Sequence, residues 1–410
     1  KPDEYREMKL STQGNFGGLG IVINIHEGLL TVVRPIEGTP ASKAGLMKGD
    51  QIVQINLDST INMSLQDAVN LLRGPPKTKV SLWVRRATWP KARRFELTRT
   101  NIRVKSVVSR RLKNDIGLVR IHNFQNTTIT ELKRAVEKLE TSRMAKRKGP
   151  LKGLILDMRG NPGGLLDQAI KVSDAFVQSG PLVTTVGYGD KMREPKMATR
   201  SGTRVDLPIV VLVDPGSASA SEIVAGALKN HHRALIVGET TFGKGSVQVL
   251  YDNKDDSALK LTIAQYLTPG DVSIQSVGIV PDVEVLRAYL DQEAVDLFPN
   301  PKRGENDLPS RLEKKGQARA PDRPLLTLPY LVAQETPRDK SMDPGDLTED
   351  FEIGLAREIL SRTNGPLRAQ MLMAASGVVE DRQKAESKKI ESALAHRGVD
   401  WSKPKPVAAG

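Results

Sequence analysis

The sequence predicts a mixed α/β chain with more than one domain. Three apolar runs have the length of a strand: residues 152–158 (KGLILDM), 207–214 (LPIVVLVD) and 233–239 (RALIVGE). Uninterrupted apolar runs of this length are typical of strands buried on both faces of a sheet. The first two runs lead through glycine-containing turns into helical patterns, and this order predicts a mixed sheet with helices on its faces. A chain of 410 residues also exceeds one ordinary core, so two or three domains are expected.

The amino-acid composition limits the kinds of binding partner and the cellular compartment expected for this chain. The formal charge is +13, which raises nucleic acid or an anionic membrane surface as partners. The basic residues are scattered, for example over 85–94 and 143–152, with little aromatic interleaving. Solubilising charge is therefore favoured, and no nucleic-acid partner is expected. Cysteine is absent, which excludes disulfides and thiolate metal sites and suits the periplasm or cell envelope of a bacterium.

Targeting and cofactor signals are weak. No apolar run approaches the roughly 20 residues of a membrane span. The opening residues (KPDEYREMKLST) resemble the remainder of a helical N-terminal region, so we expect a targeting segment to be absent from this chain. The five histidines have no metal-ligand spacing, and neither a metal nor a nucleotide is expected as cofactor. His231 and His232, at the far end of a predicted helix, are expected to be exposed.

Residues 14–99 form the first predicted domain. Strands are indicated at residues 20–25 (GIVINI), 30–33, 51–55 and 79–84, and residues 64–72 (SLQDAVNLL) predict a short amphipathic helix. The order of GGLGI, EGTPASKAGLMKGDQIVQIN and SLQDAVNLLRG resembles a PDZ domain. Such domains take an extended peptide as an added strand and receive its C-terminal carboxylate on backbone N–H groups.

The PDZ resemblance implies a peptide-binding loop at Gly18, Leu19, Gly20 and Ile21. Arg73, after the helix, matches an arginine that senses substrate in some relatives, and an exposed structural arginine is the equal alternative. The partners implied are the C-termini of proteins or peptides.

The segment 215–248 carries the candidate catalytic residues. Serines at alternate positions, with Ser219 in the middle, follow the apolar run 207–214 where it turns into a helix. The N-terminus of that helix offers free backbone N–H groups to an oxyanion. The loop 240–245 (TTFGKG) then holds Lys244 between two glycines and returns it towards the serines if the flanking strands are neighbours.

A Ser-Lys dyad is one interpretation of this segment. A serine hydroxyl becomes a nucleophile when a base takes its proton, and a neutral lysine can be that base. A free lysine has a pKa of about 10.4, and burial can lower it by roughly 3 to 5 units. The glycines beside Lys244 would let the backbone pack around its stem. The alternative is a capping box between Ser219 and Glu222 together with a solvated lysine.

A phosphate-binding loop is a second alternative. Residues 238–244 (GETTFGK) match its first seven positions and follow a predicted strand. The eighth position should be Ser or Thr but is Gly245, and residues 246–251 alternate like a strand where a phosphate-binding loop needs a helix. Nucleotide binding is therefore disfavoured.

Two motifs, GSASASEI from residue 216 and FGKGSVQ from residue 242, resemble those of the carboxyl-terminal processing peptidases, also called tail-specific proteases. In that family the middle serine is the nucleophile and a lysine 25 positions later is the base. The resemblance therefore implies Ser219 and Lys244 as the catalytic pair (244 − 219 = 25). The glutamine that orients the lysine in the family matches Gln248.

The same resemblance, which covers about residues 1–285, implies an oxyanion hole beside the nucleophile. Its candidate donors are the backbone N–H of Gly163 or Gly164, in the sequence DMRGNPGG, and that of Ala220. Each such donor is worth about 2.7 to 4 kcal/mol of barrier. A simple tight strand-to-helix turn is the alternative. Asn230 departs from the family, because some members carry an acidic residue there, and no role is assigned to it.

The resemblance predicts a serine endopeptidase that binds unstructured C-terminal segments of proteins through its PDZ domain and cleaves within them. The expected regions are an N-terminal remnant (1–13), the PDZ domain (14–99), the catalytic domain (100–287), and a linker with a helical C-terminal extension (288–410). An activating adaptor and a homo-oligomer are open as partners. The alternative function is a non-catalytic scaffold whose PDZ domain binds protein C-termini.

Overall fold

The computed structural model describes residues 14–141, 150–187, 192–200, 202–255, 257–290, 295–296, 304–307, 323–332 and 347–398, together with Tyr5, Lys9 and Thr12. The chain divides into two compact units, the first with residues 1–105 and the second with most of residues 106–410. Most of the expected N-terminal remnant (1–13) and most of the linker residues 299–321 and 337–344 lie outside the described residues. Within the described ranges, no helix is long and apolar enough to cross a membrane, and no cluster of acidic residues or histidines could hold a metal ion.

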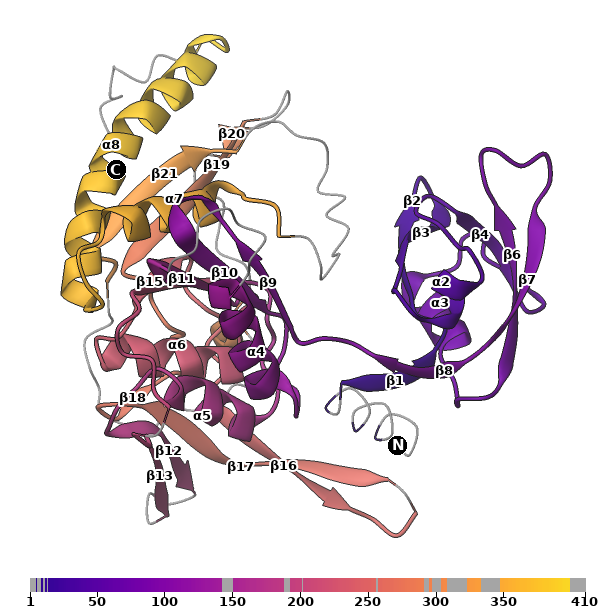
Figure 1. Cartoon of the computed structure of the whole chain (residues 1–410), viewed down its shortest axis with the longest axis horizontal. Coiled ribbons are helices and arrows are strands. Elements are labelled where there is room, and N and C mark those ends of the chain that lie inside the picture. The colour runs from indigo at the N-terminus through magenta and orange to yellow at the C-terminus, as the bar shows by residue number, and fades with distance from the viewer. Residues whose placement is uncertain are drawn as a thin grey trace, which may run out of the picture. The chain divides into compact units, whose positions relative to one another are not determined.

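The first unit is built on a small antiparallel sheet (Figure 1). Its elements are β1 (Asn15–Gly18), β2 (Ile21–His26), β3 (Leu29–Pro35), α2 (Pro40–Lys43), β4 (Gln51–Ile55), β5 (Asp58–Ser59), α3 (Leu65–Leu72), β6 (Lys79–Arg85), β7 (Arg93–Thr98) and β8 (Thr100–Arg103). The main sheet has the order β2-β3-β4-β6-β7, and β1 pairs with β8. Strand β2 therefore lies at an edge of the main sheet.

The predicted elements of this unit are confirmed to within two residues. Helix α3 begins after Ser64, whose hydroxyl accepts the backbone N–H of Asp67, as expected of an N-cap. The inward side chains of the sheet and α3 form one buried cluster that includes Val32, Leu82 and Leu72. Strands β1, β7 and β8 were not predicted, because their sequences lack an apolar pattern.

The second unit is built on a mostly parallel sheet of order β20-β19-β15-β14-β11-β10-β9, with β21 paired to β19. Its strands are β9 (Val107–Arg111), β10 (Ile116–Ile121), β11 (Gly153–Asp157), β14 (Ile209–Val213), β15 (Leu235–Gly238), β19 (Val283–Leu290), β20 (Val295–Asp296) and β21 (Leu326–Leu331). The strands β10, β11, β14, β15, β19 and β21 run parallel to one another, so their carboxyl ends meet at one edge of the sheet, whereas β9 and β20 are antiparallel to their partners. The three apolar runs predicted as buried strands are β11, β14 and β15.

Helices cover both faces of this sheet (Figure 1). They are α4 (Thr128–Thr141), α5 (Leu166–Asp174), α6 (Ala220–Asn230), α7 (Phe351–Arg362) and α8 (Arg368–Ala395), with short 3-10 turns at Lys113–Asp115 and Glu305–Asp307. Alternate side chains of β14 enter two separate cores. Val211 packs with α4, α5 and α6, whereas Val210 and Leu212 pack with α7 and α8. This division confirms a sheet buried on both faces.

A second, smaller sheet lies beside α6 and has the order β13-β12-β17-β16. Its strands are β12 (Pro181–Gly187), β13 (Arg193–Met197), β16 (Ser246–Asp252) and β17 (Ala258–Thr268), with β18 (Val272–Ser273) paired to β17. Helix α6 packs tightly here, since a Cβ on Gly226 would lie 2.4 Å from the Thr268 methyl group. The small residues of α6 therefore allow close approach of the helix to β17.

The helices α7 and α8 belong to the core of the second unit. Leu360 of α7 is 1% exposed and packs on β11, where a Cβ added to Gly153 would lie 2.9 Å from the Leu360 side chain. Ile353 and Ile359 of the same helix are also fully buried. Helices α7 and α8 thus complete the face of the sheet opposite α6.

Replacing Leu360 with alanine should lower the free energy of unfolding by about 2 to 5 kcal/mol, because it leaves a cavity between α7 and β11. Met373→Ala in α8, where the side chain is 79% exposed, is the control and should change it by less than about 0.5 kcal/mol. Urea denaturation measures both. Equal values for the two variants would contradict the packing of α7 against the sheet.

Candidate active site

Ser219 occupies a strained backbone position between β14 and α6. It is the N-cap of α6, with φ 55° and ψ −111°, a combination that non-glycine residues rarely adopt. Strained strand-to-helix turns of this kind present the nucleophile of many hydrolases above the sheet. The side chain is half-buried, so it remains accessible from one side.

The buried carboxylate of Glu222 joins the turn of Ser219 to the loop of Lys244. Its Oε2 accepts the backbone N–H of Ser219 at 2.8 Å and that of Lys244 at 2.9 Å. Its Oε1 accepts the hydroxyl of Thr241 at 2.6 Å and the backbone N–H of Gly243 at 2.7 Å. The predicted capping interaction from Glu222 to Ser219 is therefore present, but the same carboxylate also fixes the second loop.

Burial raises the pKa of Glu222 to about 7, although the four hydrogen bonds oppose this rise. The side chain is completely inaccessible to water. A carboxylate in such surroundings is stable as an anion only while its donors remain in place. The charge state of Glu222 and the geometry of both loops are thus coupled.

Lys244 lies in the loop between β15 and β16 and is half-buried. Gly243 has φ 93°, and a Cβ on Gly245 would lie 2.8 Å from the backbone nitrogen of Gln275. Both glycines therefore let the backbone of residues 275–278 pack closely against the loop on either side of Lys244. The backbone N–H of Phe242 also donates to the carbonyl of Ser217, at 3.0 Å. The loop continues into strand β16, so the helix that a phosphate-binding loop requires is absent from this described stretch.

Gln248 is four residues beyond Lys244, on β16. Its side chain is exposed, and its amide donates to the hydroxyl of Thr262 at 3.5 Å. Within the described residues, no hydrogen bond joins Gln248 to Lys244. The orienting role that the family resemblance implies for Gln248 stays a prediction.

The loop after β11 lies directly against Ser219. A Cβ on Gly163, which has φ 103°, would lie 2.9 Å from the Cβ of Ser219 and 3.0 Å from the nitrogen of Ala220. The backbone N–H of Gly163 is not free, because it donates to Oδ1 of Asn161 at 2.9 Å. No hydrogen bond of the described region uses the N–H of Gly164 or Ala220. The N–H groups of Gly164 and Ala220 are therefore the better placed candidates, and the oxyanion role expected of Gly163 or Gly164 and of Ala220 stays a prediction.

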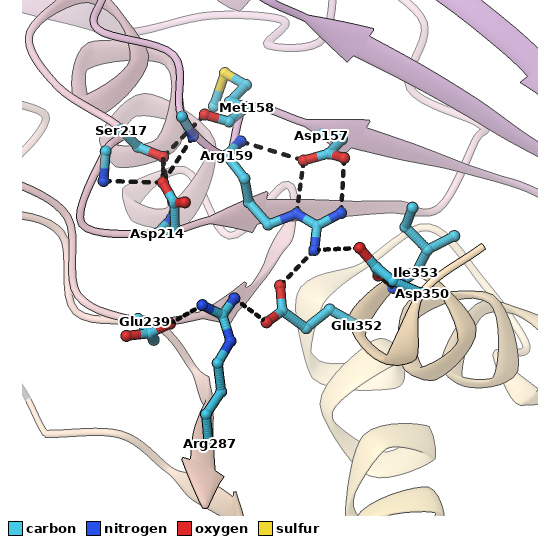
Figure 2. Close-up of polar contacts among 12 residues, drawn as sticks. Asp157, Met158, Arg159, Asp214, Ser217, Glu239, Arg287, Asp350, Glu352 and Ile353 are labelled. Atoms are coloured by element: carbon cyan, nitrogen blue, oxygen red, sulfur yellow. Dashed lines mark hydrogen bonds and ion pairs between the residues drawn. The ribbon is translucent and has the colours of Figure 1, made fainter. Parts of the chain in front are cut away.

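The polar side chains of Asp214 and Ser217 hold this loop against the turn of Ser219. The backbone N–H groups of Gly160 and Gly216 both donate to Oδ1 of Asp214, at 2.7 and 2.9 Å. The hydroxyl of Ser217 donates to the carbonyl of Met158 at 2.9 Å, as Figure 2 shows. Sequence reasoning assigned no role to Asp214; its position directly after a buried strand was the available signal.

The far end of α6 is remote from Ser219 along the chain. The amide of Asn230 donates to the hydroxyl of Thr268 and to the carbonyl of Pro269, both at 3.0 Å. His231 is half-buried, with Nε2 2.7 Å from the carbonyl oxygen of Pro181, so its expected exposure was wrong. His232 is exposed as expected.

The predicted peptide-binding loop connects β1 to the edge strand β2. Leu19 is buried, and its carbonyl accepts the N–H of Ala41 at 3.0 Å. Gly20 has φ 76°, and a Cβ there would lie 2.4 Å from Thr39, so the turn requires glycine. The guanidinium of Arg73 lies over the ring of Phe16, 4.9 Å from its centroid. An edge strand beside α3 can accept an added strand.

Comparison with known proteins defines the class of each unit. Residues 31–86 match the model of the PDZ domain, and residues 115–285 match that of peptidase family S41. A carboxy-terminal-processing protease of Bartonella bacilliformis is 43% identical over 286 residues, 69% of this chain and 64% of that protein. The carboxy-terminal processing protease CtpA of Bacillus subtilis is 39% identical over 282 residues, 69% of this chain and 59% of the relative.

The solved structure of a photosystem II D1 C-terminal processing protease is 32% identical, with a TM-score of 0.42, and the match covers 72% of this chain and 77% of that one. The chain belongs to peptidase family S41 and carries a PDZ domain. It spans about three fifths of the length of the curated relatives named above.

The raised pKa of Glu222 predicts a specific pH dependence of stability. Between about pH 4.5 and 7 the folded protein holds a proton that the unfolded chain releases, so stability falls as pH rises through this window. Glu222 lowers the free energy of unfolding by at most about 3 kcal/mol across this window. Glu222→Gln cannot titrate, so it should remove this part of the decline in the free energy of unfolding, measured with urea between pH 4.5 and 8. An unchanged slope in the variant would contradict the assignment.

Proposed function

We propose that this chain is a serine endopeptidase that cuts protein substrates near their C-termini. The observation that carries the proposal is the shared carboxylate of Glu222, which ties the strained turn of Ser219 to the loop of Lys244. The names of the relatives, carboxy-terminal processing proteases, support the same substrate class.

In the proposed reaction, Oγ of Ser219 attacks the scissile carbonyl and its proton passes to the neutral amine of Lys244. The oxyanion of the tetrahedral intermediate accepts hydrogen bonds from the free N–H groups of Ala220 and Gly164. Collapse breaks the C–N bond, the leaving amine takes the proton from Lys244, and an acyl-enzyme remains. A water molecule, deprotonated by Lys244, then attacks the acyl carbon. The ester bond to Oγ of Ser219 breaks, Oγ takes the proton back from Lys244, and the new C-terminal carboxylate is released. Gln248 would orient the lysine once substrate is bound.

The PDZ domain supplies the proposed selection of substrate. The edge strand β2 pairs with the extended tail of a substrate, and the backbone N–H groups of the loop from Gly18 to Ile21 receive its carboxylate. The partners are thus protein and peptide C-termini. The bacterial periplasm or cell envelope is the proposed location, supported by the cysteine-free sequence. An activating adaptor and a homo-oligomer stay predictions.

The dyad predicts that Ser219→Ala and Lys244→Ala each lower the rate of cleavage of a loosely folded protein by at least about 100-fold. Cleavage is followed by mass spectrometry with EDTA present throughout. Lys260→Ala, an exposed lysine of β17, is the matched control and should keep wild-type activity. A wild type that binds peptide tails without cleaving them would instead favour the scaffold function.

Recognition by the PDZ domain predicts that a peptide with a free C-terminal carboxylate binds at least about 10-fold more tightly than its C-terminal amide, because the amide loses the anion that the N–H groups receive. Fluorescence anisotropy with both peptides measures this ratio in the full chain bearing Ser219→Ala. Equal affinities would count against carboxylate capture by the loop.

A further inference from the structure

Glu352 of α7 is a buried carboxylate with both oxygens bound to guanidinium groups. It is 2% exposed and lies in the first turn of α7, where the helix dipole favours a negative charge. Its Oε2 accepts from Nη1 of Arg159 at 2.6 Å, and its Oε1 accepts from Nη2 of Arg287 at 2.6 Å (Figure 2). These arginines come from β19 and from the end of β11, which are not neighbours in the sheet.

Arg159 connects Glu352 to the oxyanion loop. It directly precedes Gly160, the first residue of the turn that carries Gly164. Its Nε and Nη2 donate to the two oxygens of Asp157 at 2.9 and 2.8 Å, and its Nη1 also reaches Asp350 at 2.9 Å. Although burial opposes ionisation, the guanidiniums of Arg159 and Arg120 hold the pKa of Asp157 well below its usual range. The guanidinium is therefore fixed on several sides by carboxylates.

Arg287 connects Glu352 to the loop of the proposed base. Its Nη1 forms an ion pair with Oε1 of Glu239 at 3.1 Å. Glu239 directly follows β15 and begins the loop that carries Lys244. Burial opposes the charge of Arg287, but the Glu352 carboxylate outweighs burial and raises the pKa of Arg287 further above its ordinary value.

We propose that Glu352 is a positioning residue that sets the distance between the oxyanion loop and the lysine loop of the same reaction centre. This inference rests on the proposed peptidase function. Its physical basis is that charge-assisted, two-sided contacts in a buried site are short and directional. A displacement of about 1 Å in either loop is enough to lower turnover strongly.

Glu358 provides a matched control on the same helix. It accepts from Arg362 at 2.6 Å and from Arg382 at 2.9 Å, and so links α7 to α8. Neither of its partners lies in a loop of the candidate site. We therefore expect Glu358→Gln to lower the stability of the fold without moving either loop of the candidate site. Glu352→Gln, in contrast, presents an NH2 group to one of its two guanidiniums and so breaks the contact with either Arg159 or Arg287.

The test compares both variants with the wild type in cleavage of an unfolded protein and in labelling of Ser219 by a fluorophosphonate probe. For Glu352→Gln we expect kcat and the labelling rate to fall about 10- to 100-fold. KM should change less than about threefold, because no substrate contact is removed. Glu358→Gln should keep kcat within about twofold. Thermal unfolding records the stability of each variant.

Several results would overturn the inference. An unchanged kcat in Glu352→Gln, an equal fall in Glu358→Gln, or an effect confined to KM would each do so. If Glu352→Gln does not fold, Arg287→Lys decides, because the lysine keeps the charge but can reach only one of the two carboxylates; an unchanged kcat there rejects the proposal. A wild-type chain inert to both substrate and probe would reject the peptidase function itself.

Discussion

The structure of the candidate site depends on one buried carboxylate. Glu222 receives hydrogen bonds from the N-cap of its own helix and from three positions of a loop about twenty residues later in the sequence. Such a group is unfavourable in an apolar interior unless its oxygens are saturated with donors. The need to saturate it forces the turn of Ser219 and the loop of Lys244 into one arrangement, and neither can move alone.

The architecture explains why these loops meet. In a parallel sheet the carboxyl ends of the strands share an edge, and the turns after β11, β14 and β15 carry Gly164, Ser219 and Lys244 respectively. Asp214 and Asn161 hold the first two turns together through backbone groups. Helix α7 then brings Glu352 to the arginines beside the first and last of these turns.

Sequence reasoning recovered the parts of this arrangement that depend on local pattern. The buried strands, helix α6 and the position of Ser219 in a strand-to-helix turn were predicted, because apolar runs and glycine-containing turns are visible within a few residues. The hydrogen bond that occupies the N–H of Gly163 was not predictable, since it depends on how the side chain of Asn161 is oriented. The role of α7 was also missed, because the partners of Glu352 lie far away in the sequence and their proximity exists only after the sheet has formed.

Contact between distant parts of the chain also sets the order of events during synthesis. Glu352 is 193 residues beyond its partner Arg159, so the ribosome synthesises Ser219, Lys244 and the described strands of the parallel sheet before α7 emerges. Until then one face of the sheet lacks its helical cover, and its apolar side chains are open to solvent or to chaperones. The contacts of Glu352 with Arg159 and Arg287 are therefore among the last that the growing chain can form, so the two loops beside them can reach their final arrangement only near the end of synthesis.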